Sequence, residues 1–299
     1  APPRTGGTVA HALHRLTTLW ALLGGAGLLA IMVVTTTNVA AFLADATFAA
    51  ITARDRGGHL WTAPILGPPG FLQADDRHTL RIGPVLPEAD PLHPLPAGQP
   101  AGVIVIDFAT RRRVRINGLL SNSDDAGCTL EVDQAYGNCP QYIHQRRVLA
   151  PHDPARTPEY RGESLRGKDI QMIESADTFF LGTTHPDSGN DASHRGGPPG
   201  FVRVTGDGLW WPDYPGNNMF NSFGNLAVDP TAALLFVDFG TGRTLQLSGT
   251  ATVDWRAPAE GDDGATGRRV RFTTRRVVAT DMPGFGQPAP HRPIPEDTP

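Results

Sequence analysis

The sequence GPPGF occurs at residues 67–71 and again at residues 197–201. Two further blocks repeat around it: DATFAAIT (45–52) matches ADTFFLGT (176–183) upstream, and VIVIDF (103–108) matches LLFVDF (234–239) downstream. All three pairs keep the same order and nearly the same offset. Such self-similarity indicates an internal duplication, so the chain is expected to consist of two copies of one structural unit.

Each copy has the sequence pattern of a small β-barrel. A continuous apolar run, 102–108 in the first copy and 232–239 in the second, is typical of a strand buried on both faces. An alternating strand follows each run, and such short strands predict a mainly β fold with peripheral helices. The expected order is an apolar helical segment (1–43), a first barrel (44–148), a linker (149–165), a second barrel (166–280) and a disordered proline-rich tail (281–299).

Composition narrows the class of protein. The 34 Gly and 28 Pro residues favour short elements over long helices. A net charge of −4 and only short basic runs give no reason to expect nucleic acid. The two cysteines, Cys128 and Cys139, lack zinc-ligand spacing, so we expect no metal. Two reduced thiols in a cytoplasmic protein are the favoured interpretation, and a single disulfide is the alternative.

The amino-terminal region contains an uncharged apolar run at residues 19–34. It is shorter than the roughly 20 residues of a membrane-spanning helix and includes three glycines. A buried or interface helix is therefore favoured, with a membrane-associated segment or the core of an export signal as alternatives.

The two copies differ just before the repeated GPPGF. The second copy has DASHRGG at 191–197, with hydroxyl, imidazole and guanidinium groups, whereas the first has WTAPILG at 61–67. The second copy also contains WPDYPGNNMFNSFGN (211–225), where the first has only a proline-rich stretch. An arginine near a Gly-Asn-Asn turn that opens a helix offers the donors a phosphate needs. A surface role for Arg195 and an ordinary turn at 217–218 are the simpler interpretations of each feature alone.

These motifs together resemble the pyridoxamine 5'-phosphate oxidase-like family of FMN-binding split-barrel proteins. The resemblance covers the second copy, and the first looks like the amino-terminal half of longer, tandem members. It implies an FMN-binding flavoprotein whose ligand lies at the seam between two barrels. The implied cofactor-binding residues are Ser193, His194, Arg195, Gly196, Trp211, Tyr214, Asn217, Asn218, Asn221, Arg243 and Gln246.

One departure bears on function. True pyridoxamine phosphate oxidases have an Arg-Lys pair where this chain has Asn217 and Asn218, and their carboxy-terminal Arg-His motif is not evident. The resemblance therefore implies an FMN-dependent oxidoreductase with a different small-molecule substrate, and NADH or NADPH is a candidate electron donor. No catalytic acid/base pair is visible. A non-catalytic flavin- or haem-binding module is the alternative, and deazaflavin is a further candidate ligand.

The family resemblance implies a dimer, and the duplication could supply both barrels within one chain. In that case the first copy would be a degenerate partner completing a single flavin site on the second. A homodimer is the alternative arrangement. Individual residues also have two interpretations: Cys139 is a redox thiol or a small buried residue, and His194 is an acid/base or metal ligand or a structural hydrogen-bonding group.

Overall fold

The computed structural model describes residues 36–83, 86–124, 127–137, 139–148, 157–206, 208–216, 219–256 and 266–281. The apolar run at 19–34 and the tail beyond 281 lie outside these residues, as do Asn217 and Asn218. Within the described part of the chain, no helix has the length and apolar character required to cross a membrane.

Seven strands form the first sheet, and helix α2 (Thr36–Asp45) precedes them. The strands are β1 (Phe48–Arg54), β2 (Leu60–Leu66), β3 (Leu72–Ala74), β4 (Thr79–Ile82), β5 (Gln99–Asp107), β6 (Arg112–Asp124) and β7 (Gly127–Gly137). Their spatial order is β2-β1-β5-β6-β7-β4-β3, and the paired strands are antiparallel.

The second sheet repeats this order. Its strands are β9 (Thr178–His185), β10 (Gly189–Gly196), β11 (Arg203–Thr205), β12 (Gly208–Pro212), β13 (Thr231–Val237), β14 (Thr244–Asp254) and β15 (Arg269–Asp281), arranged β10-β9-β13-β14-β15-β12-β11. Helix α3 (Gly167–Ser175) precedes it, and helix α4 (Asn221–Val228) lies between β12 and β13. Because each strand has its counterpart in the same place, the predicted mainly β fold with two split barrels in tandem is confirmed.

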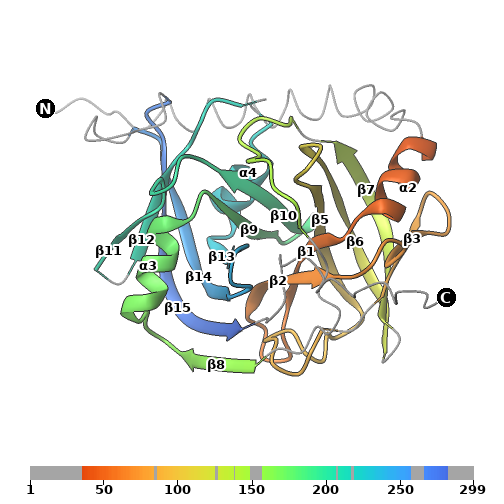
Figure 1. Cartoon of the computed structure of the whole chain (residues 1–299), viewed down its shortest axis with the longest axis horizontal. Helices are drawn as coiled ribbons and strands as arrows, with labels where there is room; N and C mark the ends of the chain where they lie inside the picture. Colours follow the sequence, from red (N-terminus) through yellow and green to blue (C-terminus); the bar gives the residue numbers. More distant parts are fainter. Residues whose placement is uncertain are drawn as a thin grey trace, which may run out of the picture.

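One expected boundary differs from the structure. Residues 149–165 were expected to be a linker, but Thr157–Gly162 form strand β8, which pairs with β15. The Pro and Arg content of this stretch suggested a linker, yet proline is compatible with an edge strand because such a strand has one unpaired side. The strand lies at the lower edge of the second sheet in Figure 1.

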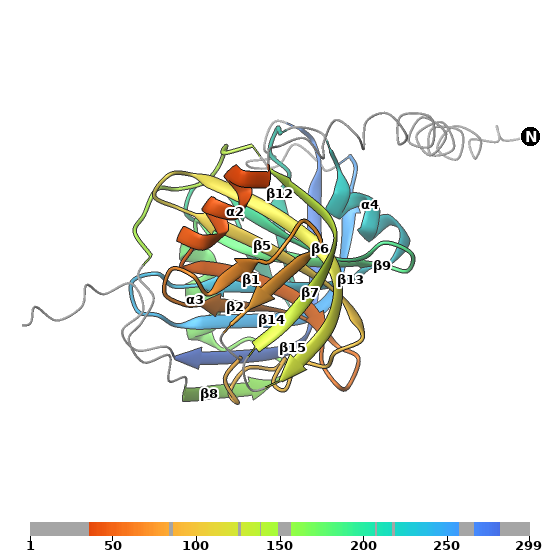
Figure 2. The same cartoon turned by 90° about the vertical axis from the view of Figure 1, so that its right-hand side faces the viewer.

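The two barrels lie side by side, the first in orange to yellow and the second in green to blue (Figures 1 and 2). Each has its own apolar core, and a third cluster joins them. That cluster includes Phe48 and Phe108 from the first barrel and Phe180 and Leu235 from the second, all nearly inaccessible to solvent. Strand β5 lies against β10 and strand β13 against β2, so the packing repeats about an approximate two-fold relation. Burial of this apolar cluster stabilises the side-by-side arrangement.

Candidate functional site

A cavity lies where the two barrels meet. From the first barrel it is lined by Arg113, Arg115, Cys139, Gln141 and Tyr142. From the second barrel it is lined by strand β10 and by the segment that leads into α4, including His194, Arg195, Gly196, Trp211, Asp213, Tyr214, Phe220, Asn221 and Ser222. We call it the cross-barrel cavity, since neither barrel encloses it alone.

Strand β10 directs alternate side chains to opposite faces, as its extended backbone requires. Asp191, Ser193 and Arg195 share the face toward α4. There the Ser222 hydroxyl lies 3.2 Å from Asp191 Oδ2 and 3.3 Å from Ser193 Oγ. Ser193 is fully buried, and its hydroxyl donates to the Leu181 carbonyl. Ser193 therefore lies behind the cavity wall and stabilises it.

Three guanidinium groups gather at the cavity. Arg115 is paired with Asp191 at 3.0 Å, and both side chains are largely buried. The Arg195 side chain makes no hydrogen bond or ion pair with the described residues, and its guanidinium lies over the Phe223 ring at 5.5 Å. Burial, together with the charge of Arg115, lowers the pKa of Arg195 to about 10. Burial and the charges of Arg115 and Arg195 lower the pKa of Arg113 to about 10 as well.

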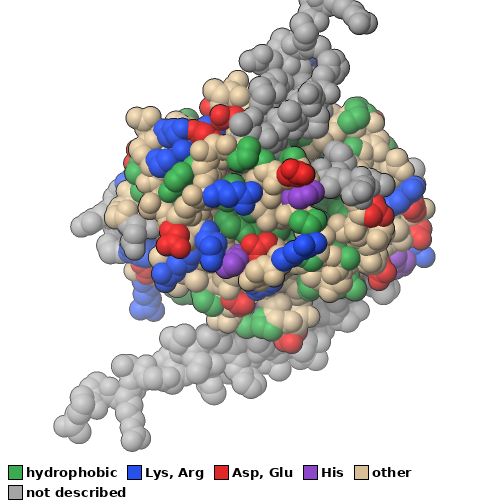
Figure 3. Space-filling view, turned by 90° about the horizontal axis from the view of Figure 1, so that it is seen from below, with side chains coloured by type: hydrophobic (Ala, Val, Ile, Leu, Met, Phe, Trp, Pro, Cys, Tyr) green, Lys and Arg blue, Asp and Glu red, His purple; other side chains and the backbone are tan. Residues whose placement is uncertain are grey.

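At neutral pH Arg113 and Arg195 remain charged, since a pKa near 10 is well above 7. Two carboxylates lie close by, but Asp191 is paired with Arg115 and Asp213 is paired with Arg268 at 2.8 Å. The cavity therefore has an excess of positive charge that a bound anion would neutralise. The outer face is different: seen from below in Figure 3, basic side chains lie beside acidic ones.

Four side-chain nitrogens at this site are buried without a hydrogen-bond partner. They are Nε of Arg113, Arg115 and Arg195 and Nε2 of His194. Buried donors in proteins are normally paired, and an unpaired one costs about 1–3 kcal/mol. Unpaired donors beside a cavity are therefore the feature expected of a site completed by a ligand.

A segment of the first barrel crosses onto the second and forms one side of the cavity. The Tyr142 ring stacks on Tyr214 with centroids 5.2 Å apart, and its hydroxyl donates to the Pro215 carbonyl. His144 Nε2 lies 2.9 Å from the Gly197 carbonyl oxygen. A Cβ at Gly196 would lie 2.0 Å from the Tyr142 carbonyl oxygen. Gly196 was expected to bind the cofactor, and in the structure the segment around Tyr142 already requires a glycine at this position.

Six of the residues expected to bind cofactor line the cross-barrel cavity: His194, Arg195, Gly196, Trp211, Tyr214 and Asn221. Trp211 also lies in the second core, edge-on to Phe179 at 4.9 Å. The Asn221 side chain donates to the Tyr136 hydroxyl of the first barrel at 2.8 Å. Cys139 lines the cavity with an exposed, unpaired thiol, and Cys128 is likewise unpaired.

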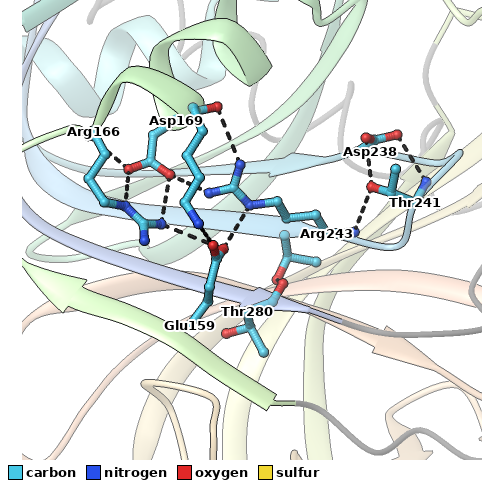
Figure 4. A network of polar contacts seen from close by, with 9 residues as sticks. Glu159, Arg166, Asp169, Asp238, Thr241, Arg243 and Thr280 are labelled. Atoms are coloured by element: carbon cyan, nitrogen blue, oxygen red, sulfur yellow. Dashed lines mark hydrogen bonds and ion pairs between the residues drawn. The ribbon is translucent and has the colours of Figure 1, made fainter.

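Two predicted residues lie away from this cavity. Arg243 takes part in an ion-pair network with Glu159 of β8 and Asp169 of α3 (Figure 4), and Glu159 also pairs with Lys168. Burial raises the pKa of Asp169, but hydrogen bonds from Arg166 and the charge of Arg243 outweigh it, so that pKa is lowered. Gln246 is fully buried and donates to the Thr62 carbonyl and to Asp90, both in the first barrel.

The position of Gln246 explains which residues the sequence reasoning missed. In the duplication, residues 113–118 align with residues 244–249, so Arg115 is the counterpart of Gln246. Each of these two side chains reaches across the seam to the other barrel. The hairpin strand that approaches the cavity of the second barrel is thus β6 of the first barrel, not β14. The alignment of the two copies indicates this role for β6, but only when the two barrels are placed face to face.

Comparison with known proteins gives one family match and several similar solved structures. Residues 168–282 match the family model described as pyridoxamine 5'-phosphate oxidase. Similar solved structures include a putative pyridoxamine 5'-phosphate oxidase from Lactobacillus delbrueckii (14% identity, 39% of this chain and 94% of that chain, TM-score 0.33). Others are the haem storage protein HutZ from Vibrio cholerae (14%, 41% and 97%, 0.30) and HupZ from Group A Streptococcus (11%, 38% and 92%, 0.31). No curated protein matches the sequence.

Proposed function

We propose that this chain, whose residues 168–282 match the family model described as pyridoxamine 5'-phosphate oxidase, binds FMN with its phosphate in the cross-barrel cavity and acts as an FMN-dependent oxidoreductase on a small molecule. The observation that supports this most directly is the cluster of three guanidinium groups with an unpaired Arg195. Guanidinium groups bind phosphate oxygens bidentately, and such charge-assisted hydrogen bonds are stronger than neutral ones.

The residues present fit a phosphate group. The guanidinium groups of Arg113, Arg115 and Arg195 carry only donors, as a phosphate requires, and Asn221 and Ser222 bring the amino-terminal backbone of α4 to the same cavity. True pyridoxamine phosphate oxidases have an Arg-Lys pair at positions 217 and 218, and Arg113 and Arg115 can supply positive charge in its place. The first barrel supplies two cations from its own strand β6, so the site has positive charge without that pair.

When bound, FMN supplies electron and hydride transfer. In this proposal the chain's own residues bind and orient the ligand: Arg195 and the α4 terminus from one barrel, Arg113 and Arg115 from the other. Among the described residues no cluster of three His, Cys, Asp or Glu side chains could hold a metal ion. NADH or NADPH remains the proposed electron donor.

The first test is the identity of the small molecule that co-purifies with the full chain, measured by absorbance spectrum and mass spectrometry. We expect FMN at one molecule per chain, since only the second barrel has Arg195. Arg195→Gln should lower FMN occupancy sharply. The matched control is Arg271→Gln, an exposed arginine paired with Asp254 away from the cavity. Equal occupancy in wild type and Arg195→Gln would refute the phosphate assignment.

A second test separates an enzyme from a non-catalytic module. An oxidoreductase predicts that NADH or NADPH bleaches the visible flavin absorbance under anaerobic conditions, and that an electron acceptor restores it. A flavin spectrum that neither donor changes would favour the non-catalytic flavin-binding module. A haem spectrum, or a deazaflavin mass, would replace FMN as the ligand.

A further inference from the structure

The Arg113 side chain extends from the first barrel into the cross-barrel cavity, where it contacts His194 of the second barrel. Its guanidinium lies 2.7 Å from His194 Nδ1 and donates to the Cys139 carbonyl at 2.8 Å. Arginine has only N–H donors, so the short contact requires a lone pair on Nδ1. His194 is therefore the neutral imidazole with its proton on Nε2.

The surroundings of His194 fix both the orientation and the charge of its ring. The residue is 4% exposed, and the ring lies edge-on to Phe108 at 6.1 Å and to Phe180 at 5.8 Å. Burial and the nearby charges of Arg113, Arg146, Arg195 and His144 lower the pKa of His194 well below its usual value. The ring is thus a rigid acceptor that stays neutral at physiological pH.

Arg113 has only neutral acceptors at the cavity: besides His194 Nδ1, its guanidinium donates to the carbonyl oxygens of Cys139 at 2.8 Å and of His194 at 3.4 Å. Its nearest charged neighbours, Arg115 and Arg195, repel it, and no carboxylate among the described residues pairs with it. A long side chain in this position would otherwise turn toward solvent.

We propose that His194 is a positioning residue, whose Nδ1 holds the Arg113 guanidinium of the first barrel in the anion site of the second. The duplicated sequence agrees with this, since the pair is absent on the other side: Pro64 is the counterpart of His194, and Thr244 is the counterpart of Arg113. The proposal rests on the proposed function insofar as the anion is the FMN phosphate.

The test is a double-mutant cycle on the full chain, with the affinity for inorganic phosphate and for FMN measured by calorimetry. Arg113→Gln should weaken phosphate binding about tenfold, the value of one hydrogen bond to a charged group. His194→Leu should weaken it by a similar factor. In the Arg113→Gln background, His194→Leu should change affinity by less than about twofold, because it acts through Arg113. His194→Asn, whose amide oxygen can replace Nδ1 as acceptor, should restore binding to within about threefold of wild type.

The outcomes separate this inference from the proposed function. Additive effects of the two substitutions, or His194→Asn binding as weakly as His194→Leu with an unchanged melting temperature, would overturn the positioning role while leaving the anion site intact. If His194→Leu does not fold, His194→Asn is compared with His194→Gln, whose amide oxygen lies near Nε2 instead. Equal phosphate affinities of His194→Asn and His194→Gln would overturn the positioning role of His194 as well. A wild-type protein that binds neither probe would refute the proposed function itself.

Discussion

The same position in the two barrels is occupied by an arginine on one side and an isoleucine on the other. Arg195 on β10 lines the cross-barrel cavity, whereas its counterpart Ile65 on β2 is 3% exposed and belongs to the core of the first barrel. The residues that reach these two strands from the other barrel, Arg115 and Gln246, also differ between the two sides. Arg115 reaches Asp191 beside the open cavity, and Gln246 reaches Asp90 and Thr62 on the other side.

The segment that precedes β5 in the first copy also differs from the segment that precedes β13 in the second. Residues 86–98 occupy the place in the first copy that α4 has in the second, and Asp90 and Leu92 within them are nearly inaccessible. One backbone plan thus contains a cationic cavity beside Arg195 and, beside Ile65, a cavity lined mostly by apolar side chains and by residues 93–97. The site therefore depends on a few side chains at the seam and not on the barrel itself.

The largest effect should come from making the first barrel resemble the second. Ile65→Arg would bury a charge without a prepared partner, which should lower the free energy of unfolding by about 3 kcal/mol or more. Chemical denaturation measures this, with Ile65→Val as the control for lost volume. Unchanged stability would indicate that the first barrel still has space for a cation.

The reverse exchange should abolish the site. Arg195→Ile removes the unpaired guanidinium, and we expect FMN affinity to fall about 100-fold, equivalent to one or two charge-assisted hydrogen bonds. Fluorescence titration with FMN gives the affinity, and the melting temperature of the ligand-free protein shows whether the fold is retained. An affinity within twofold of wild type would place the phosphate elsewhere.

A smaller change tests the contribution of the first barrel. Arg115→Gln introduces the residue found at the equivalent position of the second barrel, and it should lower FMN affinity about tenfold. It also leaves Asp191 without its ion pair, so Asp191→Asn is added as a second substitution to restore stability. If the double variant regains stability and full affinity, Arg115 serves the fold and not the ligand.

The smallest effect concerns pH. The folded-state pKa of His194 is lowered, so below the usual value of about 6.5 the unfolded chain binds a proton that the folded chain does not. Stability should therefore fall as pH decreases through 6.5, by up to about 1.4 kcal/mol per pH unit from this residue. Denaturation of wild type and His194→Asn at about pH 7.5 and pH 5.5 isolates that contribution. Parallel pH profiles would show that His194 is protonated in the folded protein.

The duplication made much of the fold predictable. The repeated blocks around residues 67–71 and 197–201 correctly indicated two related mainly β units, because both the apolar runs and the turn residues recur. Strand β8 was not predicted, since it is stabilised by pairing with β15, about a hundred residues away, and not by its own pattern. Long-range pairing of this kind leaves little trace in a local sequence window.

The candidate site was predictable on one side only. Local composition identified Arg195 and the segment leading into α4, because polar groups there replace apolar ones in the first copy. Arg113 and Arg115 lie in a strand whose local pattern is ordinary, and their role follows from what the other barrel presents to them. Arg243 was assigned to the ligand, but Glu159 and Asp169 engage it in the structure.

Because both walls of the cavity come from one polypeptide, its assembly is an intramolecular event. A site shared between separate subunits would weaken on dilution as the subunits part, whereas tethered halves keep a high effective concentration for each other. Ligand affinity in this protein should accordingly be the same at nanomolar and at micromolar chain concentrations. The covalent link also lets each half accumulate substitutions independently, since a change in one barrel is not copied into the other.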